Sequence, residues 1–270
     1  MALKRIDARV AMKNSGSALL RAIAREPTGA LERYLCEGQA NAILAKLEEL
    51  PAQEFLNAVL AELRIDVRIV GEDQLPSTGR CVFVANHPFG VVDGLILTAI
   101  VAKRYGCFRA IANDAFNLIE NLNGSVVTAN VHGRTPREDA ARILALYRSD
   151  LPITHFPAGE VSRVRNWKVR DREWHRSFVK YAILSRRDIV PVHFLGRNSP
   201  LFYATHLLRR LLGIETNVEM SLLPRETFAK RGTSVGVVIG SPISWQTLRD
   251  YGDHQAAAHA IRDIVYGLEA

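Results

Sequence analysis

The chain has 270 residues, of which 48% are hydrophobic and 23% charged, so it can bury a sizeable core and has ordinary globular composition. Its three cysteines, Cys36, Cys81 and Cys107, are far apart and form no CxxC pair, which argues against a disulfide scaffold and a cysteine-rich zinc site. The net charge of +7 favours an anionic partner. Residues 81–187 carry 16 basic and 9 acidic side chains, and this difference of 7 is the whole excess, so a basic tail is excluded.

Targeting and membrane segments are not predicted. Asp7, Arg9 and Lys13 interrupt the apolar run that a secretory signal needs. The most apolar stretch, 91–102, is too short to span a bilayer and contains Asp93. We therefore expect a soluble protein in a reducing compartment, whose membrane contact is peripheral.

Predicted elements change character after the first 65 residues. Up to residue 63, apolar residues recur at three- and four-residue steps, interrupted by Pro27 and Pro51, which predicts an N-terminal helical extension over 1–65. An α/β domain is then predicted over 66–270. Its strands are predicted at 66–70, 81–85, 108–112, 125–129, 152–156, 189–195 and 234–239. Its helices are predicted at 92–103, 136–149, 173–185, 201–212 and 254–268. This alternation predicts a largely parallel sheet of about seven strands flanked by helices, an αβα arrangement.

Polar residues directly after a strand are candidates for a site, because ligands bind beyond the carboxyl ends of parallel strands. His87 follows the strand at 81–85, and Asp93 comes six residues later. A turn at Pro88 and Gly90 could bring the carboxylate back to the imidazole, which would favour its cation and leave one ring nitrogen to accept a proton. Alternatively, Asp93 caps a helix and His87 is an ordinary loop histidine.

Two further segments follow strands. In PAGEVSR (157–163), Gly159 permits a close backbone approach to an anion, although an ordinary turn explains the pattern equally well. In NVHGRTPRED (130–139), arginines precede a predicted helix, an arrangement suited to a phosphate or carboxylate, but solvated arginines beside a capped helix are as plausible.

Common catalytic motifs are absent from the sequence. It contains no GxSxG elbow, no HExxH, and no GxxxxGK[ST] or GxGxxG loop. A serine hydrolase, a zinc protease and a nucleotide-binding enzyme all lose support. A His and Asp pair without a protein nucleophile suits activation of a hydroxyl on the substrate itself.

Four segments together resemble the glycerolipid (lysophospholipid) acyltransferase family, whose signature is NHxxxxD. NHPFGVVD (86–93) is similar to the first family block, GSVVTAN (124–130) to the second, FPAGEVS (156–162) to the third, FPEGxxS, and IVPV (189–192) to the fourth. The four blocks occur in the family's order over roughly residues 66–245. This order makes the resemblance more specific than any single block.

The resemblance implies acyl transfer from acyl-CoA or acyl-acyl carrier protein to a lysolipid hydroxyl, with no metal, no cofactor and no covalent enzyme intermediate. By resemblance, His87 is the general base and Asp93 orients and charges it. The implied substrate-binding residues are Asn86, Phe89, Asn130, Arg134, Arg137, Pro157, Gly159, Glu160 and Ser162.

Three departures from the family pattern concern the acceptor. One extra residue separates His87 from Asp93, Asn130 stands where an arginine is usual, and Ala158 stands where a glutamate is usual. Asparagine cannot supply an arginine's charge to a phosphate, although Arg134 or Arg137 could. The first and third blocks look more like the hemolysin-like branch, which includes enzymes that O-acylate lyso-aminolipids.

A basic stretch at 163–176 combines cationic side chains with tryptophans, which suits an anionic membrane surface. An acidic carrier protein could use the same surface. A solvated loop with inward-packed tryptophans is the alternative, and nucleic acid is not expected because no recognised binding motif accompanies the basic residues. The residues predicted to face the membrane are Arg163, Arg165, Trp167, Lys168, Arg170 and Trp174.

Taken together, these features predict a lysolipid O-acyltransferase attached peripherally to the cytoplasmic face of the inner membrane. The alternatives are a lipid- or carrier-binding module with an inactive site, and a thioesterase in which His87 activates water.

Overall fold

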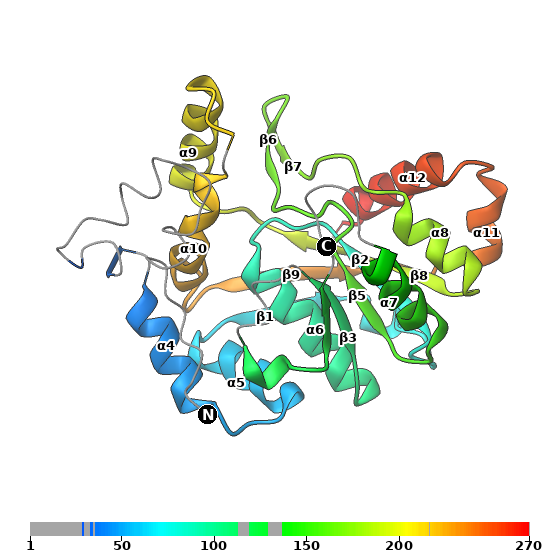
Figure 1. The fold of residues 1–270 in the computed structure, drawn as a ribbon, viewed down its shortest axis with the longest axis horizontal. Helices are drawn as coiled ribbons and strands as arrows, with labels where there is room; N and C mark the ends of the chain where they lie inside the picture. The colour runs from blue at the N-terminus through cyan, green and yellow to red at the C-terminus, as the bar shows by residue number, and fades with distance from the viewer. Residues whose placement is uncertain are drawn as a thin grey trace.

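A seven-stranded sheet forms the centre of the molecule (Figure 1). The computed structural model describes residues 29, 33, 34, 36–112, 119–128, 137–215 and 217–269. The strand order is β1-β9-β8-β2-β5-β3-β4, and all neighbours are parallel except β8 and β9. The strands are β1 (Asp66–Val70), β2 (Cys81–Ala85), β3 (Arg109–Ala112), β4 (Val126–Thr128), β5 (Ile153–His155), β8 (Asp188–Leu195) and β9 (Ser234–Ile239).

Helices cover both faces of the sheet, as predicted. Successive residues of a strand point to opposite faces, so Phe83 of β2 joins the core with α5 (Ala52–Glu62) and α6 (Val91–Tyr105). Val82 and Val84 face the opposite core, which is completed by α7 (Arg137–Arg148), α8 (Ser177–Leu184), α11 (Trp245–Asp250) and α12 (His254–Gly267). All five residues of β2 are buried, as expected for a central strand covered on both faces.

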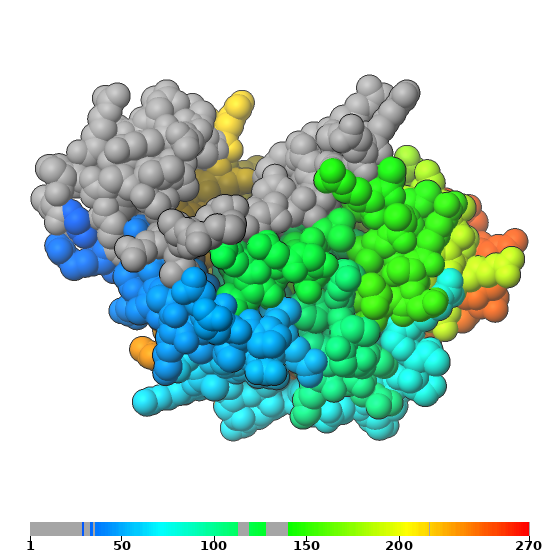
Figure 2. All heavy atoms as spheres, turned by 60° about the horizontal axis from the view of Figure 1, so that its bottom comes forward, coloured from blue at the N-terminus to red at the C-terminus, as the bar shows by residue number. Residues whose placement is uncertain are grey.

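The N-terminal extension is described only in part. Residues 1–28 lie outside the described residues, whereas α4 (Glu37–Lys46) and α5 are helical as predicted. Figure 2 shows the α4–α5 surface beside η3 (Glu120–Leu122). The Asn121 amide there donates to the carbonyl oxygens of Leu47, Glu48 and Leu50 at 2.8–3.0 Å. The domain boundary at residue 65 stays a prediction.

Several elements were not predicted, or differ from the prediction. Residues 163–170 form a hairpin, β6 (Arg163–Arg165) and β7 (Lys168–Arg170). The helix predicted at 173–185 begins at Ser177. Just before it, Trp174 is fully buried, whereas its neighbours Glu173 and His175 are exposed. After β8 come α9 (Pro200–Leu211), η4 (Val218–Leu222) and the unpredicted α10 (Leu223–Ala229).

Candidate active site

A tight turn between β2 and α6 carries His87. The turn is possible because Gly90, the residue before α6, has φ +89° and ψ −85°, a conformation that side-chain-bearing residues rarely adopt. A Cβ atom at Gly90 would also lie 3.0 Å from side-chain atoms of Val161 and Leu223. The turn therefore places His87 beyond the carboxyl end of β2 and Asp93 in the first turn of α6.

Asp93 both caps α6 and contacts His87, so the two interpretations of its role are compatible. Its Oδ2 accepts hydrogen bonds from the backbone N–H groups of Phe89 (2.9 Å) and Gly90 (3.3 Å), and its Oδ1 accepts one from Gly94 (2.9 Å). The same Oδ1 lies 3.1 Å from His87 Nδ1, within ion-pair distance although the ring N–H is not aligned for a hydrogen bond. This fully buried carboxylate thus faces one nitrogen of the imidazole and leaves Nε2 for a ligand.

The environment of His87 raises the pKa of its imidazole. Burial alone lowers that pKa, but the carboxylates of Asp93 and Asp171 outweigh burial. The ring stacks on Phe156 with a centroid distance of 4.1 Å. The His87 imidazole is therefore held in one orientation by a carboxylate at its edge and an aromatic ring on its face.

Asp171 is a part of this site that the sequence did not indicate. Its Oδ1 accepts hydrogen bonds from the His87 backbone N–H (3.2 Å) and the Ser162 hydroxyl (2.5 Å), and its Oδ2 accepts one from Trp174 Nε1 (2.9 Å). The carboxyl group is fully buried, which raises its pKa. Asp171 therefore joins the His87 turn to the 157–162 segment.

The 157–162 segment contributes both cavity wall and support. Pro157 and Gly159 line the cavity beside His87. Gly159 has φ +67° and its N–H donates to the Phe156 carbonyl at 3.0 Å, so this group is used within the turn. The Glu160 carboxylate accepts from Arg165 at 3.0 Å, and the Ser162 N–H donates to the His87 carbonyl at 2.7 Å. Glu160 thus binds the Arg165 side chain, and Ser162 binds the His87 backbone.

Asn86 and Phe89, which were predicted to bind substrate, support the turn in this structure instead. The Asn86 amide donates to the Phe194 carbonyl at 2.9 Å and accepts from the Phe194 N–H at 2.7 Å, so it joins the ends of β2 and β8. Phe89 is buried against Gly196, and Lys230 Nζ lies 4.9 Å from its ring centre. Neither side chain lines the cavity.

The prediction that Arg163 and Trp174 face a membrane is wrong, because both are buried. Arg163 pairs with Glu219 (Nε–Oε1, 3.1 Å) and lies over the Phe202 ring, and Trp174 donates to Asp171. The alternative interpretation, a loop with both tryptophans packed inward, is correct for Trp174 only, because Trp167 at the hairpin tip is 99% exposed. Arg165 and Lys168 are also exposed, and Arg170 is half-buried over Tyr266.

The predicted arginine cluster lies mostly outside the described residues. Asn130 and Arg134 are among the residues not described. Arg137 begins α7, but its side chain is outside the described part as well. Their roles stay predictions.

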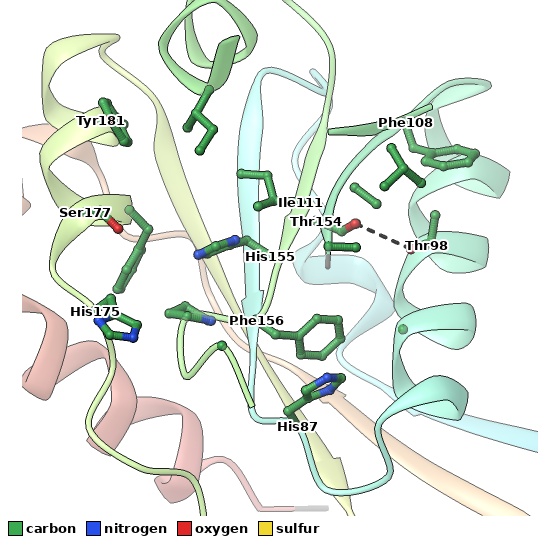
Figure 3. Close-up of a pocket in the computed structure, with 18 of the residues that line it drawn as sticks. His87, Thr98, Phe108, Ile111, Thr154, His155, Phe156, His175, Ser177 and Tyr181 are labelled. Atoms are coloured by element: carbon green, nitrogen blue, oxygen red, sulfur yellow. Dashed lines mark hydrogen bonds between the residues drawn. The ribbon is translucent and has the colours of Figure 1, made fainter. Parts of the chain in front are cut away.

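A cavity of about 370 Å³ opens beside His87, which lies at one end of it in Figure 3. This volume is within the range of small-molecule sites. Thr154 and His155 of β5 point to opposite sides, toward α6 and α8 respectively (Figure 3). The wall on the α6 side is apolar and includes Leu56, Leu95, Phe108, Leu122 and Val126. The cavity thus suits a hydrocarbon chain with its reactive end at His87.

The α8 side of the cavity contains polar groups that the sequence did not indicate. Burial, with a smaller contribution from His175, lowers the pKa of His155 to about 3, so its imidazole is neutral. Its Nδ1 and the Tyr147 hydroxyl make no hydrogen bond within the part of the chain that the structure describes. Both residues line the cavity, but these two atoms are themselves buried.

The described residues contain neither a membrane-spanning helix nor a metal-binding cluster. In that part of the chain, no helix combines the length and the apolar character needed to cross a bilayer. No cluster of three or more His, Cys, Asp or Glu side chains in those residues could hold a metal ion.

Several known proteins are similar to this chain in sequence. A family model described as "Acyltransferase" matches residues 10–270. A lyso-glycine lipid O-acyltransferase of Phocaeicola vulgatus is 33% identical over 264 residues, which are 97% of this chain and 95% of the relative. One of Bacteroides thetaiotaomicron is 34% identical over 239 residues, 88% of each chain.

A solved structure supports the fold. The 1-acyl-sn-glycerophosphate acyltransferase PlsC of Thermotoga maritima superimposes with a TM-score of 0.50 at 16% identity, covering 87% of this chain and 92% of that one. The fold is therefore that of PlsC, with its mostly parallel sheet and flanking helices. The match over residues 10–270 and the two relatives show that this chain is an enzyme of the acyltransferase family.

Proposed function

We propose that the enzyme transfers a fatty acyl chain from an acyl thioester to the free hydroxyl of a lysolipid, with His87 as general base. The observation that carries this proposal is the position of His87: Nδ1 lies 3.1 Å from the buried Asp93 carboxylate, and the ring lines a cavity that has one largely apolar wall. A hydroxyl nucleophile needs a base at its proton, and an acyl chain needs an apolar wall. The His87 imidazole and an apolar wall are both found at this cavity.

The proposed reaction needs no covalent enzyme intermediate. His87 Nε2 takes the proton of the acceptor hydroxyl while the hydroxyl oxygen forms a bond to the thioester carbonyl carbon. Asp93 stabilises the resulting imidazolium through Nδ1. The tetrahedral intermediate collapses, the C–S bond breaks, and the leaving thiolate takes the proton from His87. The products are the diacylated lipid and the free thiol of the carrier.

For the acceptor, we propose a lyso-aminolipid of the lyso-glycine type. The two relatives named as lyso-glycine lipid O-acyltransferases support this choice over a lysophospholipid. The donor is acyl-acyl carrier protein or acyl-CoA, and no other cofactor takes part. The enzyme works at the cytoplasmic face of the membrane, where the exposed hairpin residues Arg165, Trp167 and Lys168 suit anionic lipid.

The test is acyl transfer by the purified enzyme to a panel of lysolipids, with each of the two thioesters as donor. We expect transfer to an N-(hydroxyacyl)glycine and its loss in His87→Ala. His259→Ala is the matched control, because His259 is also paired with a carboxylate (Glu173, 2.8 Å) but lies exposed on α12. Wild-type activity in His87→Ala would refute the base. Hydrolysis without acceptor dependence would indicate a thioesterase, and no turnover with retained lipid binding would indicate a binding module.

A further inference from the structure

Helix α9 has an exposed leucine face opposite its buried face. Phe202, Tyr203 and His206 are buried against the protein. The outward residues of a surface helix are normally polar. Here they include Leu201, Leu207, Leu208, Leu211 and Leu212, of which Leu211 is 83% and Leu212 62% exposed.

We propose that this leucine face inserts into the surface of an anionic bilayer, together with the tip of the β6–β7 hairpin. The stretch 196–213 contains three arginines and no acidic residue, and Arg210 is exposed beside the leucines. Leucines flanked by cations, next to an exposed tryptophan, match an anionic lipid interface, where apolar groups enter the acyl boundary and cations meet head groups. We define the interfacial surface as Leu211, Leu212 and Trp167 with Arg165, Lys168 and Arg210.

The two elements of the interfacial surface stand side by side at one edge of the molecule (Figure 1). A buried cluster fixes their relative position. Glu219 of η4 is fully buried and pairs with Arg163 of β6 (3.1 Å) and with His206 (3.0 Å) and Arg209 (2.9 Å) of α9. The Arg163 guanidinium also lies 4.7 Å from the Phe202 ring centre. The hairpin and α9 therefore present one rigid surface.

The topology places this surface at the same edge as His87. Strands β2, β5 and β8 are neighbours and run parallel, so their carboxyl ends share an edge of the sheet. His87 follows β2, the hairpin follows β5, and α9 follows β8. A bilayer docked there lies on the active-site side of the sheet. This choice of partner rests on the proposed function, because a lysolipid acceptor resides in that bilayer.

The test measures sedimentation with phosphatidylcholine vesicles that contain or lack phosphatidylglycerol. We expect Leu211→Gln/Leu212→Gln to lower partition onto phosphatidylglycerol vesicles by roughly ten-fold or more, because the helix loses its two most exposed apolar side chains. The matched control is Leu184→Gln/Ile264→Gln, which removes exposed apolar residues (61% and 38%) from α8 and α12. This control should bind like wild type. Arg165→Glu/Lys168→Glu should weaken binding only to the anionic vesicles, and less at high salt.

Three outcomes would overturn the proposal. The first is unchanged vesicle binding of the α9 variant, and the second is an equal loss of vesicle binding in the control variant. The third is a wild-type dimer that the α9 substitutions convert into a monomer, as measured by light scattering, which would make the leucine face a protein interface. Circular dichroism of each variant checks folding. Vesicle binding needs no substrate, so an enzyme that binds through α9 but acylates no lysolipid would refute the proposed function and leave the interfacial surface standing. If both hold, the α9 variant should lose transfer to vesicle-embedded lysolipid and keep transfer to a short-chain micellar acceptor within about two-fold.

Discussion

Replacing Asp171 by asparagine tests whether this buried carboxylate acts on His87. The side chain accepts three hydrogen bonds, from the His87 backbone, the Ser162 hydroxyl and the Trp174 indole. An asparagine has one accepting oxygen, so its NH₂ group must face either the indole N–H or the His87 N–H. One donor is then left unpaired in a buried place, which costs about 1–3 kcal/mol. We expect a loss of about 2 kcal/mol in the free energy of unfolding.

The substitution should also change the pH dependence of acyl transfer. Asp171 helps to raise the pKa of His87, so its neutral replacement should lower that pKa. A general base must be deprotonated, and the acidic limb of the kcat/KM profile should therefore move to lower pH. If half of the unfolding loss, about 1 kcal/mol, is felt in the transition state, the plateau rate should fall by roughly five-fold.

The assay is kcat/KM against pH with a saturating thioester donor, beside urea unfolding. Trp174→Phe is the matched control, because it removes one hydrogen bond to Asp171 and no charge. We expect it to lose about 1 kcal/mol of stability and to keep the midpoint of the acidic limb. The reasoning is refuted if Asp171→Asn loses activity while its midpoint stays in place or moves to higher pH.

Three other substitutions test the supporting structure. Arg163→Ala should lower the free energy of unfolding in urea by roughly 3 kcal/mol, because it leaves the buried Glu219 carboxylate with fewer cations. The control Arg165→Ala, at an exposed residue, should change it by less than about 0.5 kcal/mol. Equal effects would contradict the burial of Arg163. Gly90→Ala should cost about 1–3 kcal/mol and most of the activity, because φ +89° and the 3.0 Å approach of Val161 and Leu223 leave no room for Cβ; wild-type kcat would argue against this turn. His155 has a pKa of about 3 in the folded protein, whereas in the unfolded chain it gains a proton below about pH 6.5. Protonation therefore favours the unfolded state, and the free energy of unfolding should fall by up to about 1.4 kcal/mol per pH unit as pH falls from about 6.5 toward 3. His155→Phe should flatten that slope in unfolding experiments at graded pH.

Most of the sheet could be predicted from the sequence because its strands are short, apolar and separated by helices. Strands buried on both faces appear as short apolar runs, and amphipathic helices as apolar residues at three- and four-residue steps. All seven predicted strands are present, with ends shifted by at most one residue from the predicted ranges, as for β3 and β5. The hairpin was missed because RVRNWKVR alternates basic and apolar residues over only two three-residue strands, too short a pattern to separate from a loop.

The site could be predicted only where a strand end marks it. His87 and Asp93 follow β2 within one turn, so the spacing allowed their contact but also allowed a helix cap with an ordinary loop histidine, and the structure shows both the contact and the cap. Asp171 is 84 residues from His87 and lies between two arginines in a basic stretch, where an acidic residue is expected to be solvated. Arg163 and Trp174 were assigned to the surface because they lie in the same basic stretch. Only the three-dimensional packing shows that these residues turn inward while their neighbours face out.

Segment 163–174 is attached to the protein at both of its ends, and by different groups. At the start, Arg163 joins Glu219 and Phe202 near α9, and at the end, Asp171 and Trp174 join the His87 turn. The Asp171 backbone adds bonds to α12, since its N–H donates to the Tyr266 hydroxyl (2.8 Å) and its carbonyl accepts from Arg262 (2.7 Å). Burying charges is costly unless they are paired, so these groups specify one orientation of the hairpin. The base of the hairpin that carries the exposed Trp167 is thereby held at a fixed position relative to His87, and a membrane that binds the tip would meet the active site in one geometry.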